Sequence, residues 1–252
     1  PTSTIINNSI SMIAAGNAVV YNPHPAAKRA SQEAMRILNE SIVTAGGPPC
    51  LITTVKEPTQ QTSNDMMNHK DIRMLSITGG EAIVKIAMKT GKKVIAAGPG
   101  NPPVIVDQTA HIQQAAKDIV DGASFDNNVL CIAEKEVFVL RTVADQLMNE
   151  MEAVGAFRVY GKDIDKIAET VLVNKSGTFY PNKDFVGRDA TCILQKSGVD
   201  YTGNPRLVIA EVEKDHPFVA VEMLMPVLPI VRVNNINDAI QEAVIAEHGF
   251  QH

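Results

Sequence analysis

Short apolar runs alternate with helical patterns along most of this sequence, and this alternation is the strongest constraint on its fold. Runs rich in Val and Ile at 51–55, 93–97 and 136–140 are typical of buried strands. Longer segments with apolar residues at helical spacing, such as 26–44 and 143–154, separate them. Because strands that alternate with helices favour βαβ units and a parallel sheet, the sequence predicts an α/β fold.

The same patterns assign the remaining elements. Further strands are predicted at 18–21, 72–77, 104–106, 207–210 and 227–233. Further helices are predicted at 5–15, 81–90, 110–123 and 237–247, with a short one inside 57–70. The Lys-, Asp- and Gly-rich segment 160–205 is weakly periodic, so short helices and loops are expected there. Met148 and Met151 lie on the apolar side of the helix 143–154 and are expected in the core.

The strongest break in the pattern is the run 98–103, which reads GPGNPP. Glycine and proline in such density end regular structure, because they respectively free and restrict the backbone. We therefore place a domain boundary at this run and divide the chain into residues 1–100 and 101–252. With 252 residues, the chain has ample length for two packed units.

Composition excludes several classes of function. The formal net charge of −5 and the lack of a basic, aromatic-studded stripe argue against nucleic acid as a partner. No apolar run reaches the roughly 18 residues that a membrane span needs, and no basic-led signal peptide is present. The three cysteines are far apart and form neither a disulfide framework nor a zinc motif, so no metal is expected. A reducing, cytoplasmic compartment fits this usage.

The two ends of the sequence predict an internal fragment. The chain starts at Pro1, with a helical pattern already under way within a few residues. It stops at His252, soon after a helix-terminating Gly249 and before any closing strand.

Two local features are candidates for chemistry, each with a structural alternative. Cys131 lies between a helical and a strand pattern, where it is either a nucleophile or a small buried apolar residue. Thr78-Gly79-Gly80 ends a strand and opens directly into a helix. Glycines there permit close approach of a phosphate to the helix N-terminus, but the pair is also typical of an ordinary tight turn.

Several separate stretches resemble the NAD(P)-dependent aldehyde dehydrogenases, in the order in which that family has them. Residues 14–20 (AAGNAVV) resemble its AAGN-x-VV strand, and 78–80 (TGG) its turn at the cofactor pyrophosphate. Residues 125–131 (FDNNVLC) match the segment that ends in the nucleophilic cysteine. Residues 222–227 (EMLMPV) resemble the stretch whose glutamate holds the nicotinamide ribose. The resemblance implies a partial, doubly wound parallel-sheet NAD-binding domain in 1–100. It also implies an α/β catalytic domain, truncated at its C-terminus, in 101–252.

The details are most similar to the CoA-acylating branch of ethanolamine and propanediol utilisation. Residues 22–28 (NPHPAAK), 97–103 (AGPGNPP) and 124–128 (SFDNN) carry this likeness. Hydrolytic members have a lysine where this chain has Asn22, so part of the cofactor contact must differ. They also have a glutamate, which activates water, where this chain has Ala97. Alanine cannot accept a proton, so the usual general base for hydrolysis is missing.

The resemblance implies a reaction in which Cys131 adds to a small aldehyde, passes hydride to NAD, and transfers the acyl group to coenzyme A. NADP is an alternative cofactor. A hydrolytic aldehyde dehydrogenase, or a catalytically silent cofactor-binding or oligomerisation fragment, are the alternative functions. The family also implies a homo-oligomer, with bacterial microcompartment shell proteins as further partners. Its second oxyanion donor, an asparagine, would fall immediately before Pro1.

The resemblance assigns roles to some residues and leaves others open. Cys131 is the implied nucleophile, with its backbone N–H in an oxyanion hole. Thr78, Gly79, Gly80 and Glu222 are the implied cofactor ligands, joined by Pro23 and His24 near the cofactor phosphates. A turn histidine without a ligand is the alternative for His24.

Four side chains are interpreted more simply. Glu134 and Lys135 are expected to form a local surface pair, and Cys50 and Cys192 to be buried, inert thiols. His248 and His252 resemble a histidine-bearing stretch of the acylating branch. They either take part in CoA or acyl transfer or are exposed surface residues without a role.

Overall fold

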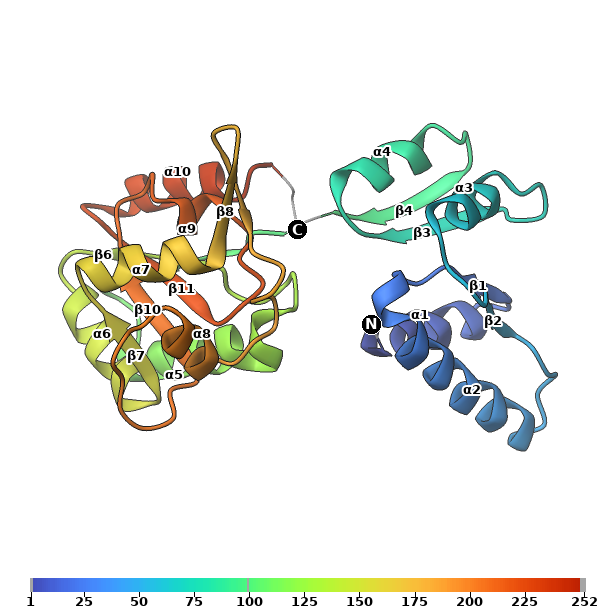
Figure 1. Ribbon diagram of the computed structural model, residues 1–252, viewed down its shortest axis with the longest axis horizontal. Helices are drawn as coiled ribbons and strands as arrows, with labels where there is room; N and C mark the ends of the chain where they lie inside the picture. The colour runs from blue at the N-terminus through green and yellow to red at the C-terminus, as the bar shows by residue number, and fades with distance from the viewer. Residues whose placement is uncertain (1, 99, 250–252) are drawn as a thin grey trace. The chain divides into compact units, whose positions relative to one another are not determined.

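The computed structural model describes residues 2–98 and 100–249, apart from the side chain of Glu81, and divides the chain into two compact units. The first unit holds the residues up to Thr78 together with Ala82–Ala96. The second holds Gly79–Glu81 and the chain from Ala97 onward. Figure 1 shows both units, with the chain coloured from blue to red along its length.

The first unit consists of short strands and longer helices in alternation. Its helices are α1 (Thr2–Ala14), the 3-10 turn η1 (Pro25–Ala27), α2 (Lys28–Thr44), α3 (Gln60–Asn68) and α4 (Glu81–Met88). Its strands are β1 (Val19–Tyr21), β2 (Ile52–Thr54), β3 (Met74–Thr78) and β4 (Lys93–Ala97). β1 and β2 pair in parallel, and β3 pairs with β4 in a second two-stranded sheet. All these elements except η1 were predicted from the apolar pattern, to within a few residues at their ends.

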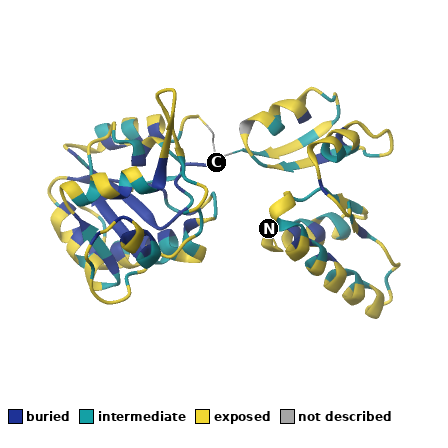
Figure 2. Cartoon of the chain, viewed as in Figure 1, coloured by how far each residue is buried: buried dark blue, intermediate teal, exposed yellow. Residues whose placement is uncertain are grey.

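Small apolar clusters hold the first unit together. Ile5, Met35 and Ile52 join α1 and α2 to β2, and Met67, Leu75 and Ala87 join α3, β3 and α4. Figure 2 shows most of this unit as exposed or half-buried, in yellow and teal.

The second unit is a three-layer α/β/α structure around a five-stranded parallel sheet. Its strands are β5 (Pro103–Val106), β6 (Glu136–Leu140), β7 (Ala156–Val159), β10 (Leu207–Glu211) and β11 (Val227–Val233). They lie in the order β5-β6-β11-β10-β7, and every neighbouring pair is parallel. The covering helices are α5 (Ile112–Ser124), α6 (Ala144–Ala153), α7 (Lys162–Val171), α8 (Ala190–Lys196), α9 (Pro217–Ala220) and α10 (Ile236–Ala246). Another 3-10 turn, η2 (Phe125–Asn128), follows α5.

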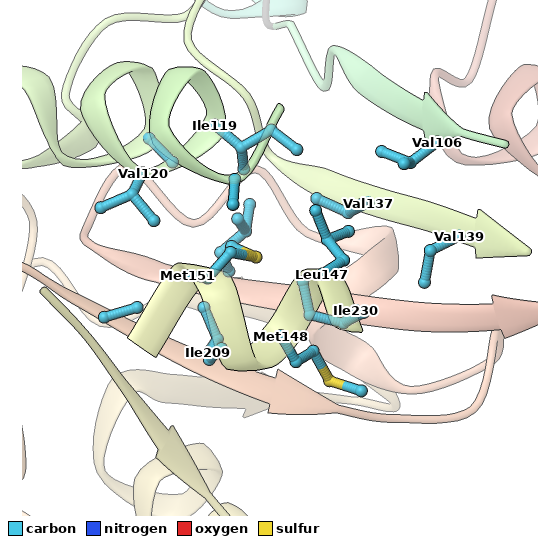
Figure 3. Packing of buried hydrophobic residues seen from close by; sticks show 14 of the residues in the cluster. Val106, Ile119, Val120, Val137, Val139, Leu147, Met148, Met151, Ile209 and Ile230 are labelled. Carbon is cyan, nitrogen blue, oxygen red and sulfur yellow. The ribbon is translucent and has the colours of Figure 1, made fainter. Parts of the chain in front are cut away.

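Side chains that alternate along each strand build the two faces of this sheet. Val137 and Val139 of β6 pack with α5 and α6, whereas Phe138 packs with α10. Because successive strand residues point to opposite faces, β6 is buried on both sides. Met148 and Met151 lie in the first of these layers, where Figure 3 shows them against the strands, and both are fully buried. Their predicted core role is confirmed.

Besides η2 and α9, two further features of the second unit were not predicted. The strand β7 was overlooked between two helices, and the segment expected to hold short helices and loops contains an antiparallel hairpin, β8 (Leu172–Lys175) and β9 (Thr178–Pro181). Ser176 and Gly177 form its two-residue turn, both with positive φ, at 54° and 89°. A Ser-Gly pair is a recognised turn signal, but the exposed strands beside it lack an apolar alternation that would have marked them.

Candidate active site

Three loops meet at one edge of the five-stranded sheet. β5, β6 and β11 are neighbouring parallel strands, so the segments that enter them lie on the same side. These segments are 100–102, 129–135 and 221–226. The Lys135 N–H donates to the Pro102 carbonyl at 3.0 Å, and the Gly100 N–H donates to the Glu222 carboxylate at 3.4 Å. Topology therefore brings the segments of Cys131 and Glu222 together, although the two residues are far apart in the sequence.

Cys131 lies in a tight turn between η2 and β6. The Ala133 N–H donates to the Leu130 carbonyl at 3.2 Å, which makes Cys131 the second residue of a four-residue turn. Its side chain is half-buried. Such partial exposure would let a thiol reach a substrate, but Cys192 is half-buried as well, so burial alone does not separate the two interpretations.

The backbone that leads to this turn is left-handed at three consecutive residues. Asp126, Asn127 and Asn128 have φ of 48°, 52° and 60°. Asp and Asn tolerate this region better than other residues with a Cβ. Asn127 adds a side-chain hydrogen bond to the Gly187 carbonyl at 3.1 Å, and another to the Asp189 carboxylate at 2.8 Å. The conformation explains why an Asp-Asn-Asn run precedes the cysteine.

Asn128 ties the turn to the elements on both sides of it. Its side-chain amide donates to the Ala123 carbonyl at the end of α5, at 2.8 Å, and to the Glu134 carbonyl, at 2.9 Å. The residue is buried, with 2% of its surface exposed. Two donated bonds in a buried position make Asn128 a structural centre of the loop.

Lys135 is buried, and the predicted surface pair with Glu134 is wrong. Only 2% of its surface is exposed, and its Nζ donates to the Leu130 carbonyl at 2.8 Å and to the Asn128 carbonyl at 2.9 Å. It also donates to the Asn128 side-chain Oδ1. Burial lowers the pKa of Lys135 to about 8, although the negative charges of Glu222 and Cys131 act in the opposite direction. The ammonium is therefore the main form at neutral pH.

Glu136, the next residue, is a fully buried carboxyl group at the start of β6. Neither of its oxygens has a hydrogen-bond partner among the described residues. Burial raises its pKa to about 9, with Lys135 opposing the shift and Glu247 adding to it. The group is thus held as the neutral acid at neutral pH. Sequence reasoning missed both Lys135 and Glu136, since a charged Glu-Lys-Glu run usually marks an exposed surface.

Glu222 is half-buried and lies in the loop between α9 and β11. Its carboxylate accepts the Gly100 N–H, so its position is tied to the segment that opens β5. The nearby Leu224 has a φ of 52°, and its carbonyl accepts the Gly187 N–H at 2.9 Å. Leu224 in the Glu222 loop and Asn127 in the segment before the Cys131 turn therefore share Gly187 as a hydrogen-bond partner.

Thr78, Gly79 and Gly80 follow the predicted arrangement of a strand end, a glycine pair and a helix start. Thr78 closes β3 and is exposed, and α4 begins directly after Gly80. A Cβ added to Gly80 would meet no described atom within 4 Å, so its outer face is open to a ligand. The Gly79 N–H donates to the carbonyl of Ala97, the residue at the position of the missing general base, at 3.1 Å.

Pro23 and His24 line a cavity of about 650 Å³ in the first unit, which Thr78 also lines. The side chain of His24 is exposed, and its Nδ1 accepts the Ala26 N–H at 3.2 Å, which caps η1. Asn22, which replaces the lysine of hydrolytic enzymes, accepts a hydrogen bond from the Thr62 hydroxyl at 2.7 Å. A cavity at the ends of β1 and β3 is where α/β sheets usually bind nucleotides.

The remaining cysteines and histidines are placed as follows. Cys50 is exposed and Cys192 half-buried, so the prediction of two buried thiols is wrong for Cys50. Cys50 follows Pro49 in the turn before β2 and also lines the cavity of the first unit. His248 Nε2 lies 2.9 Å from the Ala220 carbonyl, and His252 lies outside the described residues. Within the described chain, no three His, Cys, Asp or Glu side chains are grouped as metal ligands.

The chain matches the aldehyde dehydrogenase family over residues 1–251. The chain belongs to this family. Among its relatives, an acetylating acetaldehyde dehydrogenase of Bilophila wadsworthia is 47% identical over 260 residues. That match covers 100% of this chain and 54% of the relative, so the chain spans about half the length of the curated relative.

Solved structures of aldehyde dehydrogenases agree with the fold. A propionaldehyde dehydrogenase from a fucose-utilisation microcompartment of Clostridium phytofermentans is 43% identical, with a TM-score of 0.95. It is matched by 100% of this chain, over 57% of its own length. A propionaldehyde dehydrogenase of Rhodopseudomonas palustris with bound propionyl-CoA has a TM-score of 0.94 at 43% identity, with 100% of this chain and 55% of that chain covered. The predicted α/β fold and the resemblance to the acylating branch are confirmed. No described helix of the chain has the length and apolar character of a membrane span.

Proposed function

We propose that the protein containing this chain is a CoA-acylating aldehyde dehydrogenase with Cys131 as its nucleophile. The turn 130–133 carries the proposal, because it presents a half-buried cysteine at the sheet edge where the loops of Glu222 and Lys135 meet. The acetylating relative and the solved relative with bound propionyl-CoA support the acylating assignment.

The chemistry follows from the residues present. The Cys131 thiolate attacks the aldehyde carbon, and a new C–S bond forms as the carbonyl oxygen becomes an oxyanion. The Cys131 N–H is suited to donate to that oxygen. A bound nicotinamide cofactor supplies the acceptor for the hydride that leaves the same carbon. A thioester then joins the acyl group to Cys131. Attack by the thiol of coenzyme A breaks this C–S bond, releases acyl-CoA and restores the cysteine.

Ala97 favours transfer to a thiol over hydrolysis. Its methyl group cannot take a proton from water, so water at this position stays a weak nucleophile. Coenzyme A has a thiol with a pKa far below that of water, and it needs less assistance from a base. The reverse reaction, from acyl-CoA to aldehyde, passes through the same thioester.

For the cofactor, we propose that Thr78, Gly79 and Gly80 hold the pyrophosphate and that Glu222 holds the nicotinamide ribose. The open face of Gly80 before the N-terminus of α4 supports the first assignment, since free N–H groups there suit a phosphate. Pro23 and His24 would complete the site from the cavity wall. NAD is the proposed cofactor, with NADP as the alternative.

The setting of the enzyme is also a proposal. The Clostridium phytofermentans relative comes from a bacterial microcompartment, which supports a cytoplasmic enzyme that shell proteins enclose. A homo-oligomer is expected from the family. Fluorescence of a tagged protein that stays diffuse in cells with assembled shells would contradict enclosure.

The deciding experiment supplies the purified protein with propionaldehyde and NAD⁺ or NADP⁺, with and without coenzyme A. Reduced cofactor and acyl-CoA are expected to form together, and only when coenzyme A is present. Cys131→Ala should abolish turnover, whereas Cys192→Ala, the matched control at another half-buried thiol, should leave it unchanged. Steady turnover without coenzyme A would establish the hydrolytic alternative. Absence of turnover under both conditions would favour a silent binding module.

A further inference from the structure

Each N–H donor of the Lys135 ammonium has one hydrogen-bond acceptor in the surrounding loop. An ammonium has three N–H donors, and this one has three acceptors: the carbonyls of Asn128 and Leu130, and the Asn128 Oδ1. The residue is buried at 2% exposure. Burying a cation costs desolvation free energy even when all its donors are satisfied. A role in the turn of Cys131 would explain why this ammonium is buried there.

The bond to Leu130 fixes the orientation of the peptide that Leu130 shares with Cys131. That carbonyl accepts both the Lys135 ammonium, at 2.8 Å, and the Ala133 N–H, at 3.2 Å. No described peptide bond is cis. In a planar trans peptide the C=O and the following N–H point in opposite directions. The Cys131 N–H is therefore directed away from Lys135.

Lys135 is itself anchored independently of the loop that it holds. Its backbone N–H donates to the Pro102 carbonyl at 3.0 Å, and the next residue begins the inner strand β6. Asn128, its other acceptor, is tied to the end of α5 through the Ala123 carbonyl. The ammonium thus connects the rigid sheet to a loop whose left-handed backbone has no regular hydrogen-bond ladder.

The charges around Lys135 also favour the protonated form. Glu222, Cys131, Glu136 and Glu134 all face it closely enough to favour its positive charge. A cation held beneath the nucleophile favours the oxyanion that attack on the substrate generates.

We propose that Lys135 is a positioning residue that fixes the Leu130–Cys131 peptide, so that the Cys131 N–H points at the oxyanion of the tetrahedral intermediate. The proposal rests on the proposed function of Cys131 as the nucleophile. It assigns to Lys135 no contact with the substrate, since the ammonium is already saturated by the loop.

The test compares two reactions of the same thiol, in a Cys50→Ser background that removes the exposed cysteine. p-Nitrophenyl acetate transfers its acetyl group to Cys131 through a tetrahedral oxyanion and releases p-nitrophenolate, so this rate depends on the N–H. Iodoacetamide alkylates the thiolate by direct displacement of iodide, without an oxyanion. Mass spectrometry of the labelled peptide assigns each reaction to Cys131. Both rates are measured against pH.

Lys135→Met removes the donors at similar volume, and Lys135→Gln retains a neutral donor to the Leu130 carbonyl. Lys117→Met is the matched control, because Lys117 is exposed and pairs with Asp121 on the surface. We expect Lys135→Met to slow acylation about 10- to 100-fold more than alkylation, with Lys135→Gln recovering part of the loss. The ratio of the acylation rate to the alkylation rate should fall in both variants at every pH measured.

Kinetics with aldehyde give a second readout. The Lys135 variants should lower kcat and leave the KM for aldehyde within about twofold, since the lost interaction forms only in the transition state. Urea unfolding checks that each variant is folded. If Lys135→Met does not fold, the comparison with the parent protein is made with Lys135→Gln.

The outcomes separate the two proposals. Equal slowing of acylation and alkylation, or no slowing of either, would overturn the positioning role while leaving Cys131 as the nucleophile. Failure of the parent protein to acylate at Cys131 would overturn the proposed function and the positioning role together.

Discussion

Replacing the buried acid Glu136 with glutamine should change how the stability of the second unit depends on pH. Glu136 is fully buried at the start of β6, and its pKa is raised to about 9 from an ordinary value of 4.5. The folded protein therefore keeps a proton that the unfolded chain releases between these two values. Since the folded state binds more protons, the free energy of unfolding must fall as the pH rises through this range.

The expected size follows from linkage. One proton of difference corresponds to about 1.4 kcal/mol per pH unit, so the free energy of unfolding should fall by about 4 kcal/mol between roughly pH 5 and pH 8. Glu136→Gln is neutral throughout and lacks this slope. Above about pH 8 the lowered pKa of Lys135 acts in the opposite direction, because the unfolded chain then holds the extra proton. The comparison therefore belongs below pH 8.

Urea unfolding followed by tyrosine emission suits this measurement. The protein has no tryptophan and four tyrosines, of which Tyr160, Tyr180 and Tyr201 lie in the second unit. The free energy of unfolding of Glu136→Gln minus that of the parent protein should grow by about 4 kcal/mol from about pH 5 to about pH 8. Subtracting the two proteins cancels the other titrating groups, such as His216, whose pKa burial lowers. A difference that stays constant with pH would refute the assignment of a neutral Glu136. Glu136→Met, a second neutral variant, should match the glutamine variant in slope.

Three further predictions concern the same unit. Gly187→Ala should destabilise it by roughly 1–3 kcal/mol, since Gly187 has a φ of 69° and a Cβ there would lie 2.8 Å from the Val129 side chain. Gly198→Ala, at a φ of 65° with open space, is the control, and an equal loss in urea unfolding would contradict the clash. Asn128→Ala should cost about 2–4 kcal/mol for its two donated bonds and lost acceptor, well above Asn127→Ala, at a half-buried residue, in the same assay. Arg232→Met should cost about 1 kcal/mol near pH 7. Arg232 holds the pKa of Glu211 below its usual range, so this stabilisation is present above the ordinary carboxyl pKa and is lost as the pH falls. An Arg232 effect that persists in urea melts at about pH 3 would contradict that pairing.

The sequence was sufficient for most of the secondary structure and for the family. Strands such as β6 and helices such as α5 could be located because burial on one or two faces imposes a local periodicity on apolar residues. The apolar pattern did not reveal elements that pack weakly against the core. The hairpin β8–β9 is mostly exposed, so neither of its strands carries the apolar alternation that reveals a strand.

The candidate nucleophile could also be identified from the sequence, because the run before Cys131 resembles a known segment. Its surroundings could not. Lys135 was interpreted as a surface charge, since charged residues are rarely buried and the sequence does not record what covers them. Cys50 read as buried for the opposite reason, because free cysteines usually are.

By itself, the sequence determined the α/β class, the order of the elements and the cysteine on which the proposed chemistry depends. Only the tertiary structure decided which side chains surround that cysteine. The sheet order β5-β6-β11 brings Gly100, Lys135 and Glu222 to one edge from three distant segments. Local periodicity reports whether a residue faces a core, but strand order depends on long-range packing. That packing turns Lys135 from an apparent surface charge into the buried support of the Cys131 turn.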